Sequence, residues 1–447
     1  MAGSDTIAAV ATAPGRAAIG IVRVSGPLAR GIAERIVREP LSPRRAVHAR
    51  FSDEQGRPMD EGLALYFPAP HSYTGEDVLE LQGHGGPVVL RTVLECCLRL
   101  GARLAEPGEF TRRAFLKGKL DLAQAEGVID LIDAASEQAA RSAMRSLSGE
   151  FSAQIQGLNK GLVELRALVE ATLDFPEEEI DVVHRADAEA RLQRVRDQLS
   201  GVLEASRQGS LLREGMHVVL AGQPNVGKSS LLNRLAGDER AIVTDIPGTT
   251  RDTIREAIDI EGIPLHVVDT AGLRAPGDPV EAMGIDRTWA AIEAADAIVL
   301  VVDATAGETE ADRAIMIRLP GRLRRIVVMN KVDLLHRDPG MTTESSSEVR
   351  VWLSAKTGEG MDLLRRALLD VAGWRGTTEG VFLARARHLE ALRRAQAHLE
   401  RAGDELDRAE LLAEELRLGH EAIASILGEF TADDLLGEIF SRFCIGK

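Results

Sequence analysis

The stretch MHVVLAGQPNVGKSS, residues 216–230, decides the fold of the central part of this chain. An apolar, valine-containing run ends at a glycine, and residues 222–229 then match the pattern G-x-x-x-x-G-K-[ST]. In this pattern glycines let backbone N–H groups close around phosphate oxygens, the lysine supplies charge to the outer phosphates and the hydroxyl can bind Mg²⁺. The stretch predicts a strand, a phosphate-binding loop and a helix, with Lys228 and Ser229 as the functional side chains.

Four further motifs lie downstream, three of them at the ends of predicted strands. DTAG (269–272) suits a Mg²⁺-bound water and the γ-phosphate, and GTTRD (248–252) offers a switch threonine, for which we choose Thr250. NKVD (330–333) suits guanine, because its aspartate accepts from the ring N–H and the exocyclic amine that adenine lacks, and SAK (354–356) resembles the loop that caps the base. Together these motifs resemble the G-domain family and predict GTP binding; a decayed pseudo-GTPase is the alternative.

Two features indicate which subclass of GTPase this module resembles. The residue after DTAG is Leu273, where Ras-like enzymes have a water-positioning glutamine, and neither Arg251 nor Arg274 is clearly an arginine finger. Asn225 resembles the asparagine of potassium-activated GTPases, in which K⁺ takes the place of the arginine charge. The predicted ligands are Ser229 and Thr250 for Mg²⁺, and Asn225, Thr244, Ile246 and Thr249 for K⁺. The predicted GTP-binding residues are Asn225, Val226, Gly227, Lys228, Ser229, Ser230, Thr244, Asp245, Ile246, Pro247, Gly248, Thr249, Thr250, Asp269, Thr270, Ala271, Gly272, Asn330, Lys331, Asp333, Ser354, Ala355 and Lys356.

Outside residues 216–376 the pattern of apolar and polar residues indicates two further kinds of structure. Residues 1–118 mix short β-rich runs with Gly/Pro punctuation and predict an α+β domain. Residues 119–210 are predicted to be helical, and apolar side chains at helical spacing over 122–162 predict a long helix or two in series. Pro176 interrupts this pattern, and a second helical pattern runs from about 185 to 209. Residues 211–378 alternate strands and helices, as in a doubly wound α/β sheet, and 379–447 are helical again. We expect the two helical segments to form one split domain with the α/β module inserted between them.

Composition excludes several classes of protein. The chain of 447 residues has a net charge of −15, which argues against nucleic-acid binding over the whole surface. Residues 1–120 hold 16 Lys/Arg and 13 Asp/Glu, a net of +3, so the remainder carries −18. No run is long enough to span a membrane, and the first residues do not resemble a signal peptide. Three cysteines, two of them adjacent, predict reduced thiols and a cytoplasmic location.

Longer motifs carry a specific resemblance. They are HSYTGEDVLELQGHGG (71–86), KLDLAQAE (119–126), GSLLREGM (209–216), GEFTADDLLG (428–437) and FCIGK (443–447). From end to end the chain resembles the bacterial tRNA modification GTPases that act on the wobble uridine. The resemblance implies an N-terminal folate-binding and dimerisation domain, a split all-α helical domain and an inserted Ras-like G domain.

The resemblance also implies a function. We expect a homodimeric GTPase, activated by K⁺ through G-domain dimerisation, that works with an FAD- and NADH-dependent partner protein in a heterotetramer. The pair would add an aminomethyl or carboxymethylaminomethyl group to C5 of the wobble uridine in certain tRNAs. The cofactors would be GTP, Mg²⁺, K⁺ and a formyl- or methylene-tetrahydrofolate that supplies the one-carbon unit. The expected folate contacts are Arg23, Glu80, Lys119 and Lys447, with Lys117 as a rival to Lys119, and Glu281 is expected to orient the attacking water.

The terminal CIGK superficially resembles a prenylation box, but its third residue is glycine and its last is lysine. In the family this terminus enters the folate pocket and brings Cys444 towards the one-carbon unit, so Cys444 is a candidate catalytic residue. His84 is either a folate or tRNA contact or a turn residue. Two other functions remain open: a K⁺-dependent ribosome-assembly GTPase without covalent chemistry, and a scaffold that only positions tRNA for the flavoprotein.

Overall fold

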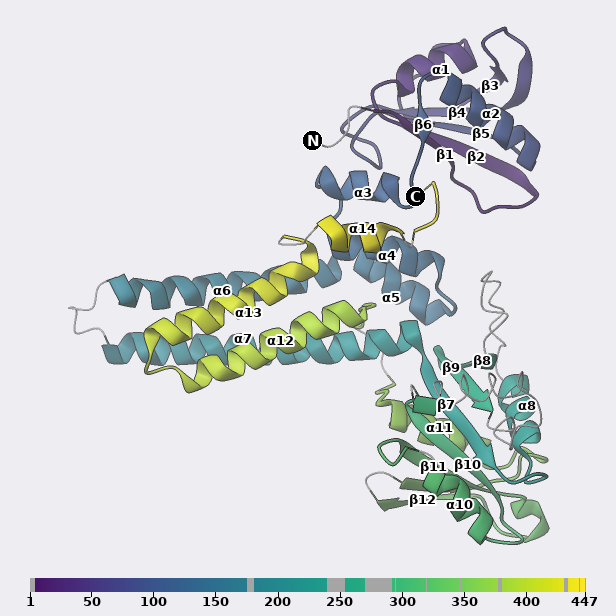
Figure 1. Cartoon of the computed structure of the whole chain (residues 1–447), viewed down its shortest axis with the longest axis vertical. Helices are drawn as coiled ribbons and strands as arrows, with labels where there is room; N and C mark the ends of the chain where they lie inside the picture. Colours follow the sequence, from purple (N-terminus) through teal and green to yellow (C-terminus); the bar gives the residue numbers. More distant parts are fainter. Residues whose placement is uncertain are drawn as a thin grey trace. The chain divides into compact units, whose positions relative to one another are not determined.

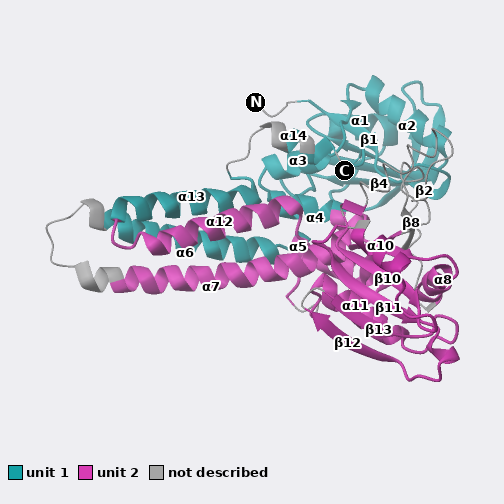
Figure 2. Ribbon diagram, turned by 60° about the horizontal axis from the view of Figure 1, so that its bottom comes forward, with its two compact units in different colours: residues 1–129, 147–174, 409–447 teal, residues 130–146, 175–408 magenta. Residues whose placement is uncertain are grey.

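The computed structural model describes residues 5–174, 181–238, 254–269, 292–293, 295–318, 320–345, 348–376, 380–429, 433–441 and 443–446. The chain divides into two compact units, coloured separately in Figure 2. Unit 1 combines 1–129, 147–174 and 409–447, and unit 2 combines 130–146 and 175–408. Both units are therefore assembled from segments that are distant in the sequence.

Unit 1 begins with a six-stranded sheet in the order β3-β4-β5-β2-β1-β6. The strands are β1 (Ile7–Val10), β2 (Ala17–Ser25), β3 (Val47–Ser52), β4 (Pro58–Phe67), β5 (Val78–Gly85) and β6 (Arg103–Leu104). Helices α1 (Ala29–Val37) and α2 (Pro87–Arg99) pack against this sheet (Figure 1). Alternating residues of β2 and β5, among them Val22 and Leu79, are buried against apolar helix residues such as Ile32. The other side chains of these strands, including Arg23 and Glu80, point to the opposite face.

Besides α1 and α2, the described helices of unit 1 are α3 (Glu109–Leu116), the first part of α4 (Leu122–Ile132), α6 (Glu150–Asp174), α13 (Ala409–Leu427) and α14 (Asp433–Ser441). Helices α6 and α13 lie side by side along their lengths (Figure 1). A separate apolar cluster joins the first turns of α4 to the end of the chain. Its buried members are Leu122, Ala125, Leu436, Ile439, Phe440 and Phe443.

Unit 2 contains a seven-stranded sheet in the order β12-β13-β11-β10-β7-β9-β8. Its strands are β7 (Met216–Gly222), β8 (Ile254–Ile260), β9 (Ile263–Asp269), β10 (Ala297–Asp303), β11 (Arg324–Asn330), β12 (Gly340–Ser345) and β13 (Glu348–Trp352). The five central strands are parallel, and the edge strands β8 and β12 are antiparallel to their neighbours. Helices α8 (Lys228–Asp238), α10 (Glu310–Arg318) and α11 (Met361–Ala372) accompany the sheet. The strand runs are almost wholly buried, as expected for a parallel sheet that is covered on both faces.

The remaining helices of unit 2 are α5 (Glu137–Leu147), α7 (Asp181–Glu214) and α12 (Ala386–Asp404), of which α7 and α12 lie side by side (Figure 1). The prediction of one long helix, or two in series, from the apolar residues at 122–162 is wrong, because three helices, α4, α5 and α6, lie there. The second helical pattern, predicted for about 185–209, corresponds to α7. The first break ends at Ser136, whose hydroxyl accepts the N–H of Ala139 and so caps α5. The second break is at Gly149, whose φ of +91° is a left-handed conformation that ends a helix.

Within the described ranges, no helix is both long and apolar enough to cross a membrane. The same residues contain no group of three or more His, Cys, Asp and Glu side chains arranged to hold a metal ion. All three cysteines are unpaired; Cys96 and Cys97 are buried in unit 1, and Cys444 is exposed.

Candidate functional site

The loop at residues 223–227 connects β7 to α8 at the carboxyl end of the parallel strands. Gly222, Asn225 and Gly227 adopt φ values of +144°, +64° and +102°. A Cβ at position 227 would lie only 2.3 Å from Nδ2 of Asn330, so a larger residue does not fit there. Left-handed residues in such a loop gather backbone N–H groups on its concave side, next to the N-terminus of a helix. The loop therefore has the backbone geometry of a phosphate site.

Lys228, the first residue of α8, folds back over this loop. Its Nζ donates to the carbonyl oxygens of Gly222 at 2.6 Å and of Gln223 at 2.9 Å. These two contacts hold an ammonium charge against the same backbone that presents the N–H groups. Ser229 and Ser230 follow at the exposed start of the helix. A phosphate chain in the loop would thus meet a cation and a helix N-terminus together.

Asn330 connects three loops at the end of β11. Its side chain is 3% exposed; Nδ2 donates to the carbonyl of Val226 at 2.8 Å, and Oδ1 accepts the N–H of Ala355 at 2.9 Å. This pair of bonds fixes the phosphate loop to the 354–356 loop. The phosphate loop and the 354–356 loop, two predicted parts of a nucleotide site, are therefore held in register by one amide.

The carboxylate of Asp333 is the acceptor that the predicted guanine contact needs. Its Oδ1 is buried and has no hydrogen-bond partner among the described residues. A buried carboxylate oxygen left without a donor is costly, and the ring N–H and exocyclic amine of guanine would satisfy it. Its neighbour Lys331 has a φ of +72°, and its Nζ lies 2.6 Å from Oδ2 of Asp303. Burial alone would raise the pKa of Asp303, but hydrogen bonds from Lys331 and Thr305 lower it overall, so the carboxylate stays ionised.

Part of the predicted nucleotide site lies outside the described residues. Asp269, the first residue of the DTAG motif, ends β9, and its backbone pairs with Leu220 of β7, the strand that leads to the phosphate loop. The predicted residues outside the described ranges are Thr244, Asp245, Ile246, Pro247, Gly248, Thr249, Thr250, Thr270, Ala271, Gly272, Glu281 and Lys447.

A second candidate site lies on unit 1, around Arg23. Arg23 and Glu80 are cross-strand neighbours on β2 and β5, and their side chains form an ion pair at 2.9 Å with 20% and 16% exposure. The guanidinium carbon of Arg23 is 5.6 Å from the ring centroid of Tyr73 and 5.8 Å from that of Phe110. A partly exposed arginine, a carboxylate and two aromatic rings are suited to a flat, anionic, hydrogen-bonding ligand.

The C-terminal segment reaches this second site within unit 1. Arg23 Nη1 donates to the carbonyl of Gly446 at 3.3 Å, and the N–H of Gly108 donates to the carbonyl of Cys444 at 3.4 Å. Ile445 forms an isolated β-bridge with Pro107. Gly446 has a φ of +101°, and a Cβ there would lie 2.3 Å from the carbonyl oxygen of Val10. The tail is therefore held by backbone contacts in which position 446 requires glycine.

The other candidate residues on unit 1, Lys119, Lys117 and His84, form no hydrogen bond or ion pair with Arg23 or Glu80 in the described part of the chain. Lys119 Nζ donates to the carbonyl of Pro70 at 3.2 Å, and the stems of Lys117 and Lys119 flank Gly75, so the alternative between these lysines stays open. His84 is exposed; its Nδ1 lies 2.7 Å from Oδ1 of Asp60, a contact that raises the pKa of the imidazole.

The aromatic residues Tyr73 and Phe110 were missed by sequence reasoning. Burial raises the pKa of the Tyr73 phenol, against the opposing effects of its hydrogen bond with Thr111 and of the charge on Arg23. One signal was available: Tyr73 is one of only two tyrosines in the chain and lies inside the quoted motif at 71–86. Phe110 offered no comparable signal, because the sequence does not show that α3 begins beside β2.

Gly446→Ala should release the tail from unit 1. The side chain would collide with the carbonyl of Val10 in a backbone conformation that alanine rarely adopts, at an expected cost of about 1–3 kcal/mol. We expect faster hydrogen exchange at the N–H of Gly108, the donor to Cys444. The matched control is Gly437→Ala in α14, where a Cβ would meet no atom within 4 Å. Unchanged exchange in the Gly446 variant would contradict this account.

Family models and curated relatives match the chain along almost its whole length. A family model described as the MnmE helical domain matches residues 122–444, and one described as the N-terminus of the GTP-binding protein TrmE matches 6–119. The chain is 61% identical over 443 residues to the tRNA modification GTPase MnmE of Thiobacillus denitrificans, with 99% of this chain and 98% of that protein covered. It is also 61% identical over 452 residues to the protein of the same name from Nitrosomonas europaea, with both chains fully covered.

Solved structures are more distant. Era of Aquifex aeolicus bound to GDP·AlF₄⁻ is 25% identical to the chain, covering 41% of this chain and 66% of that one, with a TM-score of 0.26. The G domain of the T. maritima FeoB iron transporter is 22% identical, covering 35% of this chain and 98% of that one, also with a TM-score of 0.26. TM-scores this low carry no argument about the architecture of the whole chain.

Proposed function

The chain belongs to the MnmE family of tRNA modification GTPases, and from this premise we propose that its GTPase reaction drives the addition of a one-carbon-derived group to the wobble uridine of tRNA. The product is an aminomethyl or carboxymethylaminomethyl substituent at C5. The proposal assigns nucleotide hydrolysis to unit 2 and one-carbon chemistry to unit 1. Its supporting observation is that Arg23 contacts both Glu80 and the tail that carries Cys444.

In unit 2 the residues divide the work of nucleotide binding. Backbone N–H groups of the 223–227 loop and the ammonium of Lys228 hold the outer phosphates. Asp333 accepts from the guanine edge, and Asn330 fixes the distance between the base and phosphate ends of the site. Because Asp333 needs the ring N–H and the 2-amino group of guanine, and adenine has neither, ATP is rejected.

The metal ions of the proposal fit the residues that are described. The hydroxyl of Ser229 begins α8 directly after Lys228, and the side chain of Asn225 is exposed on the phosphate loop, so both are accessible as oxygen ligands. Thr250 completes the proposed Mg²⁺ set, and Thr244, Ile246 and Thr249 complete the K⁺ set. When bound, these cations neutralise the charge that develops on the phosphoryl group. Glu281 orients the attacking water.

In unit 1 the residues around Arg23 fit a reduced folate. The guanidinium suits its carboxylates, the carboxylate of Glu80 suits the N–H groups of the pterin edge, and Tyr73 and Phe110 offer apolar faces. Lys119 and Lys447 add positive charge for the glutamate tail of the folate. We assign the one-carbon chemistry to Cys444, which is exposed and precedes Ile445, the residue that is bridged to Pro107.

The proposal includes partners. A homodimer brings two G domains together for K⁺-dependent hydrolysis, and an FAD- and NADH-dependent protein supplies the redox step, as a heterotetramer with this one. The tRNA is the substrate of the complex. Residues 1–120 carry a net charge of +3 and the rest of the chain −18, which favours the N-terminal part of the sequence over the rest as the RNA contact.

The test is nucleoside analysis of wobble uridines in reactions that contain the flavoprotein, tRNA, a reduced folate, GTP and either K⁺ or Na⁺. We expect product only with this protein present and much faster GTP turnover in K⁺. Cys444→Ser should abolish the product and leave GTP hydrolysis unchanged, because the thiol lies in the other unit from the nucleotide site.

The alternatives give different results. A ribosome-assembly GTPase would retain K⁺ dependence but yield no modified uridine and bind no reduced folate. A scaffold that only positions tRNA would support modification in the Cys444→Ser variant. Equal GTP turnover in K⁺ and Na⁺ would contradict the proposed activation.

A further inference from the structure

One buried carboxylate holds both connections between the seven-stranded sheet and the helices of unit 2. Arg213 lies in the last turn of α7, just before β7, and Arg385 immediately precedes α12. Arg213 Nε donates to Asp130 Oδ1 at 3.0 Å, and Arg385 Nη2 donates to the same oxygen at 2.8 Å. The side chain of Asp130 is 5% exposed, against 30% for Arg213 and 11% for Arg385. The chain therefore enters and leaves the inserted domain through residues bound to one anion.

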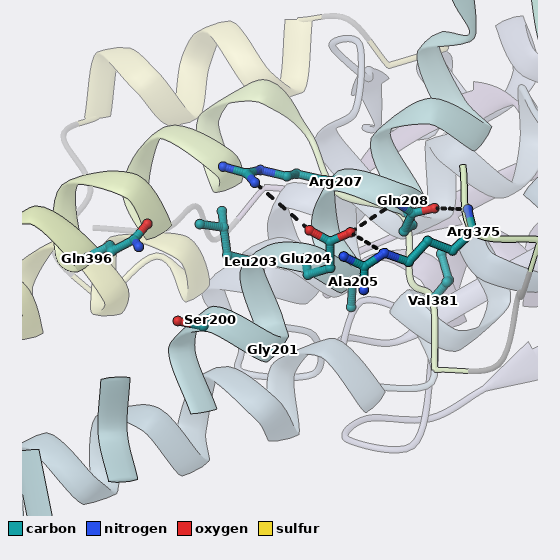
Figure 3. Close-up of a pocket in the computed structure, with 10 residues that line it drawn as sticks. All are labelled: Ser200, Gly201, Leu203, Glu204, Ala205, Arg207, Gln208, Arg375, Val381 and Gln396. Atoms are coloured by element: carbon teal, nitrogen blue, oxygen red, sulfur yellow. Dashed lines mark hydrogen bonds and ion pairs between the residues drawn. The ribbon is translucent and has the colours of Figure 1, made fainter. Parts of the chain in front are cut away.

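We call this arrangement of Asp130, Arg213 and Arg385 the joint, and further contacts connect the same two chain segments. Gln208 of α7 donates from Nε2 to the carbonyl of Gly373 at 2.8 Å and accepts the N–H of Arg375 at 3.2 Å. Figure 3 shows Gln208 and Arg375 around the cavity of about 630 Å³ that adjoins the joint, with Arg375 Nε 3.2 Å from Glu204 Oε1. A Cβ at Gly209 would lie 1.9 Å from the carbonyl of Phe382, so the departing chain runs directly against α7. The two connections thus form one packed element.

Asp130 lies near the end of α4, a helix whose first turns pack against the C-terminal segment. This helix is continuous from Leu122 to Ile132. Two turns before Asp130, Leu122 and Ala125 are fully buried against Phe440 and Phe443 of the C-terminal segment. Cys444 is the next residue after Phe443. The same short helix therefore packs against the C-terminal segment through its first turns and binds the two arginines of the joint through Asp130 near its end.

We propose that Asp130 is a positioning residue that couples GTP hydrolysis to tRNA modification, by tying both connections of the nucleotide-binding domain to α4. Asp130→Asn removes the one charge that Arg213 and Arg385 share, so the joint responds strongly to this one position. Among the described residues, Asp130 has no hydrogen bond or ion pair with residues 222–230, 330–333 or 354–356, so we expect that hydrolysis itself does not require it. The inference rests on the proposed function, because its output is the modified uridine.

The test uses the full chain with Asp130→Asn and measures GTP turnover and modified uridine in the same reaction. We expect kcat and KM for GTP within about twofold of wild type, and about tenfold less modified uridine per GTP hydrolysed, a typical size for coupling between sites. An unchanged ratio overturns the proposal. A parallel loss of both activities also overturns it, since that result indicates a purely structural role.

Further variants distinguish a loss of coupling from simple misfolding. Arg385→Gln keeps the Asp130–Arg213 pair, and we expect it to lower the same ratio, with a double variant no worse than Asp130→Asn alone. Additive losses in the double variant would contradict a shared joint. The matched control is Asp197→Asn, an exposed carboxylate on α7 that accepts a hydrogen bond from Gln193, and it should leave both activities unchanged.

A second measurement is independent of tRNA chemistry. Hydrogen exchange along α4 is compared with GDP and with a non-hydrolysable GTP analogue. We expect a difference between the two nucleotides in the wild type and none in Asp130→Asn. A wild type that makes no modified uridine would refute the proposed function alone, whereas α4 exchange that ignores the nucleotide in the wild type would refute the coupling.

Discussion

Lys228→Ala should reduce kcat for GTP hydrolysis by about a hundredfold to a thousandfold, the usual effect of removing one preorganised charge from a phosphoryl-transfer site. The lysine ammonium is held against the phosphate loop by the carbonyls of Gly222 and Gln223, at 2.6 and 2.9 Å. No other lysine of the described residues lies in this loop, so no neighbouring ammonium replaces it. Steady-state turnover and nucleotide affinity, measured separately, show how much of the loss arises in the transition state.

The control for this variant is Lys160→Ala. Lys160 is an exposed lysine of α6 whose nearest carboxylate, that of Glu164, is 4.0 Å away. Such surface pairs contribute little, so turnover and stability should match the wild type. If Lys228→Ala retained more than about a tenth of the wild-type kcat, the assignment of Lys228 to the outer phosphates would be wrong.

Asp333→Asn should change the base that the protein accepts. The carboxylate accepts two N–H groups from guanine, while asparagine offers one acceptor and one amine donor. We expect GTP affinity to fall by at least about a thousandfold, because a site built for specific hydrogen bonds rejects a mismatched ligand strongly. Xanthosine triphosphate, which has a carbonyl where guanine has the amine, should bind the variant instead.

The measurement is competitive binding of GTP and xanthosine triphosphate to both proteins. Asp338→Asn is the control, since that carboxylate is exposed five residues further along and should not affect either nucleotide. Equal loss of both nucleotides would point to a disrupted loop rather than to base recognition. Rescue by xanthosine triphosphate excludes misfolding, because a misfolded loop would bind neither base.

The phosphate loop could be predicted from sequence because its parts are contiguous. Residues 222–230 carry the glycines, the lysine and the hydroxyl within a single strand–loop–helix turn, and the structure forms that turn as predicted. The alternating pattern of residues 216–376 likewise indicated a doubly wound sheet, and the family resemblance was confirmed by comparison along the whole chain.

The helical region was harder to predict. Apolar spacing correctly indicated helices over 119–210 but could not show that Ser136 and Gly149 separate three of them. A serine or glycine within a helical pattern is tolerated about as often as it ends a helix, and its side-chain or backbone partners decide between the two.

The sequence by itself predicted the phosphate loop and the strands that lead to the 269–272, 330–333 and 354–356 motifs, because each depends on residues that are adjacent in the chain. Only the tertiary structure decided that Arg23 contacts Glu80 and Gly446, which lie 57 and 423 positions away, and that Asp130 binds Arg213 and Arg385. These contacts depend on which strands pair and which helices pack. Pairing and packing are set by burial across the whole fold, and no local spacing in the sequence encodes them.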